Sequence, residues 1–483
     1  MAVASIVGAG QVIQRPGSVE LDSARGPVEL MAEAALLAAQ DAGAPSLLGR
    51  IDWIGVAGGW FRYRNPGQLL AQLLGSPWAR TALSSVSGTG PQEMVAFAAE
   101  RIAKGEMGVA LVVGGEARWS HQRLKRAGRD PSWNTDPGEG DPQSFGGFPA
   151  EMIAEAAVIG PPIHAYALIE DSLRNELGES IDVHRRRIAE LWSRFSTVAA
   201  GNPWAWHPSA LGPDEILMES ADNRMLAFPY TKAMVANNTV DMASCVLVCD
   251  QETARSAGVG RDRMVFPIVV ASAHDTWRLA NRDHLHRCPA LEASGRAAFG
   301  HAGIGPDAIS HVDLYACFPS IVEISAAALG FPLDAPLTLT GGLGFAGAPV
   351  GNSVGHSIAA LVGALRGGGY GLIHANGGNA TKHSVGIYSD RPAGAFEHLD
   401  VQDRVASGGR LEMPSDFDGG VHVEAATVIY DRDGPSQVLA AVLDQEARRG
   451  WARSDSASLI EATLDTGIAG QVAIRTAEGT LDV

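Results

Sequence analysis

The sequence predicts an α/β protein made of two similar halves, followed by a small β-rich unit. Three observations support this prediction. Glycine-rich turns, alanine-rich helical segments and short apolar runs alternate along most of the chain, as in sheets covered by helices. One unit of this kind occurs twice. The last part of the chain instead alternates apolar and polar residues, which is the periodicity of half-buried strands.

The repeated unit is a glycine-rich turn, a helix, a glycine break, an apolar strand and a glycine pair. It reads VSGTGPQEMVAFAAERIAKGEMGVALVVGGEA in the first half and VGNSVGHSIAALVGALRGGGYGLIHANGGNA in the second. Gly88 and Gly114 in the first copy are as many positions apart as Gly351 and Gly377 in the second. Equal spacing of complete supersecondary units indicates a duplication.

Composition limits the classes of function. The 483 residues are 46% hydrophobic and 19% charged, as in a globular protein with a large core. The net charge of −17 opposes binding to nucleic acid or to an anionic membrane. We expect a cytoplasmic protein, because MAVASIVGAGQV resembles a first strand rather than a signal peptide and the cysteines show no disulfide framework. Those cysteines are Cys245, Cys249, Cys288 and Cys317.

Changes in composition along the chain divide it into four parts. We expect the first half to cover residues 1–265, including a polar excursion at about 118–230, and the second half to cover residues 266–395. Residues 396–418 are expected to form a linker between the second half and the last part of the chain. Residues 419–483 contain three alternating runs and are expected to form an additional β-rich domain.

Four segments, in this order, resemble the thiolase superfamily. SVSGTGPQEMVAFAAERIAKGEMGVALVVGGEA is similar to the segment that carries the nucleophilic cysteine, and HVDLYACFPSIVEISAAALGF to the Asn-Glu-Ala-Phe segment. GAPVGNSVGHS resembles the Gly-His-Pro segment and HANGGNATKHSVGIYS the Cys-x-Gly segment. The resemblance covers residues 3–390 and is greatest to the sterol-carrier-protein-type thiolase-like branch, whose members have an extra C-terminal domain.

The resemblance implies a five-layer α-β-α-β-α thiolase fold, in which two βαβαβαββ halves enclose two central helices. It also implies an acyl-CoA thioester substrate in lipid metabolism, with no tightly bound cofactor. Thiolase-like cores pair through an edge strand of the first half, so a homodimer is expected. The additional domain could block that contact or bind another protein.

This sequence departs from the family at each of the four usual catalytic positions. Ser87 stands in place of the nucleophilic cysteine, and Tyr315 in place of the asparagine of Asn-Glu-Ala-Phe. Ala348 replaces the histidine of Gly-His-Pro, and His374 replaces the second cysteine. Thiolysis by the usual residues is therefore not expected.

Ser87 could act as a nucleophile only with the help of a base. The dipole at a helix N-terminus offers at most about 2 kcal/mol, which is too little to ionise a serine hydroxyl. His374 and His356 are the candidate bases, because a serine–histidine pair is the usual way to activate this weak nucleophile. The alternative is that Ser87 only caps the helix that follows it.

Tyr315 could donate a hydrogen bond or act as an acid or base, unless it is simply a packed interior tyrosine. Asn376, Gly377 and Gly378 form a turn whose backbone N–H groups could serve as an oxyanion hole, although tight packing explains the glycines equally well. No metal site is expected, since the ligand types in HLHRC have no second ligand group at a suitable spacing.

Three functions fit these residues. The first is a thiolase-like acyltransferase that makes or breaks carbon–carbon bonds in acyl-CoA thioesters, in which Ser87 holds the acyl group and His374 moves the proton. In the second, Tyr315 and His374 cleave a hydroxyacyl-CoA by a retro-aldol reaction and Ser87 lines the pocket. The third is a noncatalytic thioester-binding scaffold whose C-terminal domain docks a partner.

Overall fold

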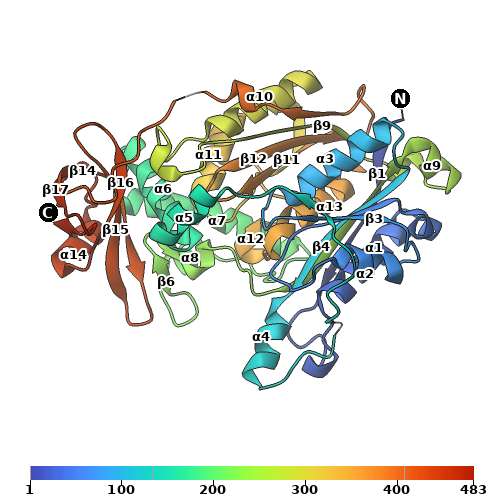
Figure 1. The fold of residues 1–483 in the computed structure, drawn as a ribbon, viewed down its shortest axis with the longest axis horizontal. Coiled ribbons are helices and arrows are strands. Elements are labelled where there is room, and N and C mark those ends of the chain that lie inside the picture. Colours follow the sequence, from blue (N-terminus) through green and yellow to red (C-terminus); the bar gives the residue numbers. More distant parts are fainter. Residues whose placement is uncertain (1, 134, 407, 483) are drawn as a thin grey trace.

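Two β-sheets and two central helices form the main body of the molecule, and a third sheet adjoins them. The computed structural model describes residues 2–133, 135–406 and 408–482. Figure 1 shows the layers of the main body in sequence from α10, through the sheet that contains β9, the helices α3 and α13, and the sheet that contains β4, to α1.

The first sheet has six strands in the order β1-β8-β4-β2-β3-β5. Its strands are β1 (Ala4–Ile13), β2 (Trp53–Val56), β3 (Arg80–Ser84), β4 (Val109–Ala117), β5 (Gln143–Phe145) and β8 (Asp241–Asp250). The neighbouring strands β4, β2, β3 and β5 are parallel to one another. Strand β8, in contrast, is antiparallel to both of its neighbours, β4 and β1. The central strand β4 is buried along its whole length, which explains its continuous apolar sequence.

The second sheet has the order β10-β11-β12-β9-β13. Its strands are β9 (Phe266–His274), β10 (Ile309–Asp313), β11 (Tyr370–Gly377), β12 (Lys382–Ser389) and β13 (Glu397–Asp400). The run β10-β11-β12-β9 has the same relative strand directions as β2-β4-β8-β1 in the first sheet. The two halves therefore repeat one topology, and the duplication predicted from the glycine spacing is confirmed.

The helices α3 (Gly90–Ala103) and α13 (Ser353–Leu365) lie between the two sheets and contact strands of both. Because α13 is covered from both sides, it is apolar around most of its circumference, as a fully buried helix must be. The outer layers contain α1 (Pro27–Asp41) and α2 (Pro66–Leu73) on the first sheet, and α10 (Pro289–Ala302) and α11 (Pro319–Leu329) on the side of the second. This arrangement confirms the predicted five-layer fold.

The excursion forms mainly helices; its long later helices contact α11 of the second half, whereas its first helix and β5 contact the first half. Its elements are α4 (Arg118–Arg126), β5, α5 (Ala150–Ile159), α6 (Pro162–Glu176), α7 (Ile181–Gly201), α8 (Pro213–Leu217), β6 (Met225–Ala227) and β7 (Tyr230–Thr231). Strand β5 pairs with β3 and so occupies the outer edge of the first sheet. Two short helices complete the main body, α9 (Gln251–Ser256) and α12 (Gly342–Phe345).

The C-terminal unit is a sheet in the order β16-β15-β14-β17-β18, to which β6 is joined. Its elements are β14 (Gly419–Tyr430), β15 (Pro435–Leu443), β16 (Arg449–Ser454), α14 (Ala457–Asp465), β17 (Val472–Arg475) and β18 (Leu481–Asp482). The sheet packs against α6, next to which it lies in Figure 1. The buried side chain of Arg449 donates to the carbonyl oxygen of Leu279 and pairs with Glu424, which fastens the unit to the second half.

The stretch expected to be a linker contains regular structure. Residues Glu397–Asp400 form β13, which pairs in parallel with β9 at the edge of the second sheet. Residue 407 lies outside the described residues. Within the described ranges, no single helix is both long and apolar enough to cross a membrane, and only α5 and α6 together, bent by 80°, reach that composition.

Candidate functional site

A cavity of about 440 Å³ lies where the two halves and the excursion meet. Its walls come from the turn before α3, the segment between β10 and α11, the loop before α13, the turn after β11, and helices α5 and α6. Apolar side chains line much of it, and its polar groups are hydroxyls, amides and one thiol. None of the described lining residues is an acid, a histidine or a basic residue.

Ser87 lies in the wall of this cavity and is 5% exposed. Its Oγ atom is hydrogen-bonded to Oγ1 of Thr89 at 2.9 Å. The helix α3 begins at Gly90, so the N-cap position belongs to Thr89 and not to Ser87. A Cβ atom added at Gly377, the last residue of β11, would lie 2.2 Å from Ser87 Oγ, which shows how closely the end of this strand approaches the hydroxyl. Of the predicted turn Asn376–Gly378, the first two residues thus belong to the strand and only the last lies beyond it.

Tyr315 lies beside Ser87 and faces the same cavity. A Cβ atom at Gly88 would lie 2.5 Å from Cε2 of Tyr315 and 2.3 Å from the carbonyl oxygen of Asn376, so only glycine lets these segments meet. The Tyr315 hydroxyl has no hydrogen-bond partner among residues 2–133, 135–406 and 408–482. Burial raises the pKa of the phenol well above its ordinary value, so the hydroxyl stays protonated and can donate a hydrogen bond.

The predicted turn after β11 is held by a tyrosine that sequence reasoning missed. Tyr166, on α6, accepts hydrogen bonds from Nδ2 of Asn376 at 2.8 Å and from the N–H of Ala380 at 2.9 Å. Its hydroxyl donates to the carbonyl oxygen of Gly378 at 3.1 Å. Oδ1 of Asn376 is buried without a hydrogen-bond partner, so an acceptor remains free at the site. No sequence motif marks Tyr166, because its partners lie more than 200 positions away along the chain.

The structure does not bring His374 to this cavity. His374 lies within β11, two residues before Asn376 and three residues before the end of the strand. Its Nδ1 atom is 3.1 Å from Oγ of Ser325 on α11, and its Nε2 atom is 3.2 Å from Nδ1 of His383. Burial, together with the neighbouring His383, lowers the pKa of His374 well below its ordinary value. His374 therefore cannot act on Ser87 from this position.

His356 also lies apart from Ser87. It is on α13, and its Nδ1 atom is 2.8 Å from Oε1 of Gln11 on β1. Burial lowers the pKa of His356 to about 3, so the ring is neutral near pH 7. Ala348, which the sequence resemblance places where the family has a catalytic histidine, does line the cavity. A methyl group thus occupies the place from which a base would act.

Two buried groups contain residue types that can bind a metal ion. In each group the ligand atoms lie within 4.8 Å of one another. In the second group, however, the carboxyls are already engaged, because His184 binds Glu170 and Arg187 pairs with Glu323. The groups are Asp275, Cys288 and His383, and Glu170, His184 and Glu323.

The fold and the site were then compared with known proteins. No protein-family model and no curated protein sequence matches the chain. Among solved structures, the crystal structure of a monomeric SCP2-thiolase-like protein type 1 from Mycobacterium smegmatis superposes with a TM-score of 0.85. The two chains are 29% identical, and the match covers 100% of this chain and 99% of the other. This chain has a thiolase-like fold over its whole length.

A second solved structure, an Ltp2–ChsH2(DUF35) aldolase, superposes with a TM-score of 0.61 at 18% identity. The match covers 80% of this chain and 98% of the aldolase chain. At this identity the likeness concerns the fold alone. The full-length match to the mycobacterial protein includes the additional C-terminal strands, so the resemblance noted from the four sequence segments is confirmed.

Proposed function

We propose that this protein binds an acyl-CoA thioester in the cavity and acts on its acyl group by aldol chemistry, without a covalent acyl-enzyme. The observation that supports this proposal is that Ser87 and Tyr315 line one cavity, whose described lining has no carboxylate, histidine or basic side chain. A serine nucleophile needs a partner that accepts its proton, whereas a neutral phenol is already a suitable hydrogen-bond donor.

The reaction would be the cleavage of a β-hydroxyacyl thioester, or its reverse. The bond between the α and β carbons breaks, its electron pair goes to the thioester enolate, and the β carbon becomes a carbonyl carbon. The hydroxyl proton ends on the α carbon, so the overall step is neutral. The Tyr315 hydroxyl would give its proton to the thioester oxygen as negative charge develops there, and it would take up the proton of the β-hydroxyl group in exchange. The proton of the resulting enol then moves to the α carbon, and Tyr315 ends in its original state.

The groups around Tyr315 suit this role. Burial keeps its phenol protonated, and the apolar walls strengthen any hydrogen bond that it makes to an oxyanion. Cys317 also borders the cavity, but burial raises the pKa of its thiol to about 12, so a thiolate is not available near neutral pH. Ser87 would form part of the wall, with its hydroxyl bound to Thr89.

An acyltransferase remains the second candidate, for one specific reason. The Ser87 hydroxyl lies against Gly377, so the end of β11 could bind the oxyanion of an acyl-serine intermediate. That function predicts a covalent mass increase on Ser87, whereas the aldol function predicts none.

Turnover of β-hydroxyisovaleryl-CoA to acetone and acetyl-CoA tests the proposal. We expect the wild type to release both products and Tyr315→Phe to lose about two to four powers of ten in kcat, while thioester binding persists. Tyr430→Phe, which changes a tyrosine of the C-terminal sheet, is the matched control and should turn over normally.

Mass spectrometry of the intact protein separates the two candidates. After incubation with acetyl-CoA or acetoacetyl-CoA, we expect no acyl adduct. An adduct that disappears in Ser87→Ala would reject the aldol mechanism in favour of the acyltransferase. Binding of both thioesters without any turnover would instead leave a scaffold function.

We also propose a cytoplasmic protein that is not paired through the edge of the first sheet. Strand β5 already pairs with β3 at that edge, which supports a monomer in place of the expected homodimer. The second solved structure has an aldolase combined with a DUF35 component, and this supports a protein partner for the C-terminal unit. Val472 and Ile474, exposed on β17, are candidate contacts for such a partner.

A further inference from the structure

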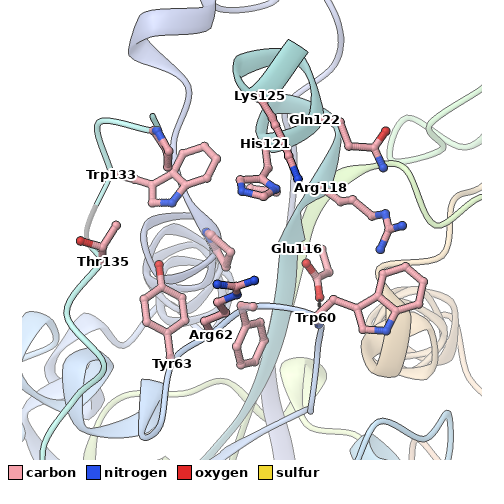
Figure 2. Close-up of a pocket in the computed structure, with 14 residues that line it drawn as sticks. Trp60, Arg62, Tyr63, Glu116, Arg118, His121, Gln122, Lys125, Trp133 and Thr135 are labelled. Carbon is pink, nitrogen blue, oxygen red and sulfur yellow. Dashed lines mark hydrogen bonds between the residues drawn. The ribbon is translucent and has the colours of Figure 1, made fainter. Parts of the chain in front are cut away.

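A second hollow of about 510 Å³ lies next to the reaction cavity, and we call it the basic pocket. Figure 2 shows its side chains, which come from the loop after β2, the end of β4, the helix α4 and the segment beyond it. Trp60 lines both the basic pocket and the reaction cavity. The two hollows are therefore neighbours that share one tryptophan side chain.

The basic pocket has a concentration of positive charge on an acidic protein. Arg62, Arg118 and Lys125 line it, whereas the whole chain has a net charge of −17. None of these three side chains forms a salt bridge or hydrogen bond within residues 2–133, 135–406 and 408–482. Nε of Arg118 is buried without a hydrogen-bond partner, which costs free energy unless a ligand supplies an acceptor.

Flat aromatic side chains form the rest of the wall. In Figure 2, Trp133 and Tyr63 stand on one side of the pocket and Trp60 on the other. The guanidinium of Arg118 lies 3.9 Å from the centre of the Trp60 ring, so the indole holds this cation in place. Aromatic walls with cations between them suit a planar ring that bears a negative charge.

One carboxyl opposes the cations. Glu116, at the end of β4, accepts a hydrogen bond from the N–H of Trp60 at 2.5 Å, and it also lines the pocket. The lining therefore has three cationic side chains and one carboxyl, which leaves an excess of two formal positive charges when His121 is counted as neutral. An anion is therefore favoured over a cation or a neutral group.

We propose that the basic pocket binds the distal end of the acyl group, and that this end is a ring bearing a carboxylate. The inference rests on the proposed function, because it requires the thioester carbon to lie beside Tyr315. From there, a rigid acyl group that passes Trp60 enters the basic pocket directly. The phosphates of coenzyme A are the other anionic part of such a substrate, but the long pantetheine arm separates them from the thioester carbon.

Binding of two matched thioesters tests this assignment. Phenylpropanoyl-CoA and its para-carboxy derivative have no β-hydroxyl group, so neither is turned over and calorimetry reports only affinity. We expect the wild type to bind the carboxylate about tenfold more tightly, as one charge-assisted hydrogen bond allows. Arg118→Met should abolish this preference and leave the affinity for the neutral thioester unchanged.

Arg126→Met is the matched control, because Arg126 is on the same helix but does not line the pocket, and it should keep the preference. Equal affinity of the wild type for the two thioesters would overturn this inference but would leave the proposed function standing. If Arg118→Met weakens both thioesters equally, the pocket holds the nucleotide end, and the inference also fails. If neither thioester binds, the proposed function fails and the inference with it.

Discussion

The reaction cavity and the basic pocket share Trp60, yet they differ completely in charge. Among the described residues that line the cavity around Ser87 and Tyr315, no side chain is charged near neutral pH, whereas the described lining of the pocket presents three cations and one carboxyl. The cavity is formed by turns packed against each other, and a charge there would lose its hydration. The pocket borders an exposed helix, where cations remain partly hydrated.

This difference in charge suits the cavity to the reaction and the basic pocket to the recognition of the substrate. In a neutral, apolar cavity, a hydroxyl donor interacts strongly with a developing oxyanion, because no water competes with it. In the more open pocket, cations select the ligand by charge without altering the reacting atoms. Variants on each side of Trp60 should therefore affect different quantities, and the following predictions test that separation.

The largest effect is expected from Gly88→Ala. The new Cβ atom would lie 2.5 Å from Cε2 of Tyr315, so the phenol must move away from the thioester. We expect turnover of β-hydroxyisovaleryl-CoA to fall by about two to four powers of ten, measured as kcat/KM. Gly363→Ala is the control, because a Cβ atom there meets no neighbour within 4 Å. Normal turnover by Gly88→Ala would show that the position of Tyr315 is unimportant.

The next effect concerns the carboxyl that opposes the cations. Burial raises the pKa of Glu116 from 4.5 to about 7. The folded protein thus holds this proton more tightly than the unfolded chain, and stability is lost as pH rises from 4.5 through 7. We expect Glu116→Gln to exceed the wild type in free energy of unfolding by roughly 3 kcal/mol at pH 8 and by little at pH 4.5.

Urea unfolding of both proteins at the two pH values measures this difference. Glu478→Gln, which changes an exposed carboxyl, should show no such dependence on pH. A constant difference between Glu116→Gln and the wild type across this range would mean that the carboxyl is not desolvated.

A smaller effect, on the free energy of unfolding, is expected from a change of Trp60, which lines both hollows. Trp60→Leu removes the aromatic face on which the Arg118 guanidinium lies. A double-mutant cycle of Trp60→Leu with Arg118→Met should give a coupling of about 0.5–1 kcal/mol in the free energy of unfolding. Independent effects of the two substitutions would indicate that Trp60 does not position this cation.

The smallest effect on turnover is expected from His374→Asn. His374 is hydrogen-bonded to Ser325 and His383 outside the cavity, so its removal should lower the melting temperature and leave kcat unchanged. Measuring kcat on the folded fraction separates the two effects. A loss of kcat as large as that of Tyr315→Phe would restore His374 as a catalytic residue.

Much of the fold was predictable because it depends on local patterns. The glycine spacing of the two repeats predicted matching α3–β4 and α13–β11 units, and the strand orders of the two sheets agree with this. The region at 396–418 was less predictable. Residues Glu397–Asp400 have no apolar alternation, and they form a strand only because β9 offers them a free edge.

The candidate site was predictable only in part. Ser87, Tyr315 and the turn at Asn376–Gly378 were found because each follows or precedes a regular element at a position known from the family, and the structure brings them together. His374 and His356 have suitable chemistry, but each packs against partners elsewhere. A sequence does not tell on which side of a strand or helix such partners will lie.

The sequence by itself determined the duplicated α/β architecture, because helix and strand periodicity and glycine turns act over a few residues. It also predicted, from the resemblance of four segments, that the usual thiolase residues are replaced, because such a prediction needs only the residue at each position. Only the tertiary structure decided which polar groups share a cavity. Tyr166 reaches Asn376, and Arg118 lies on the ring of Trp60, through contacts between segments far apart in the chain. Such contacts depend on how the layers pack, and no local pattern specifies that packing.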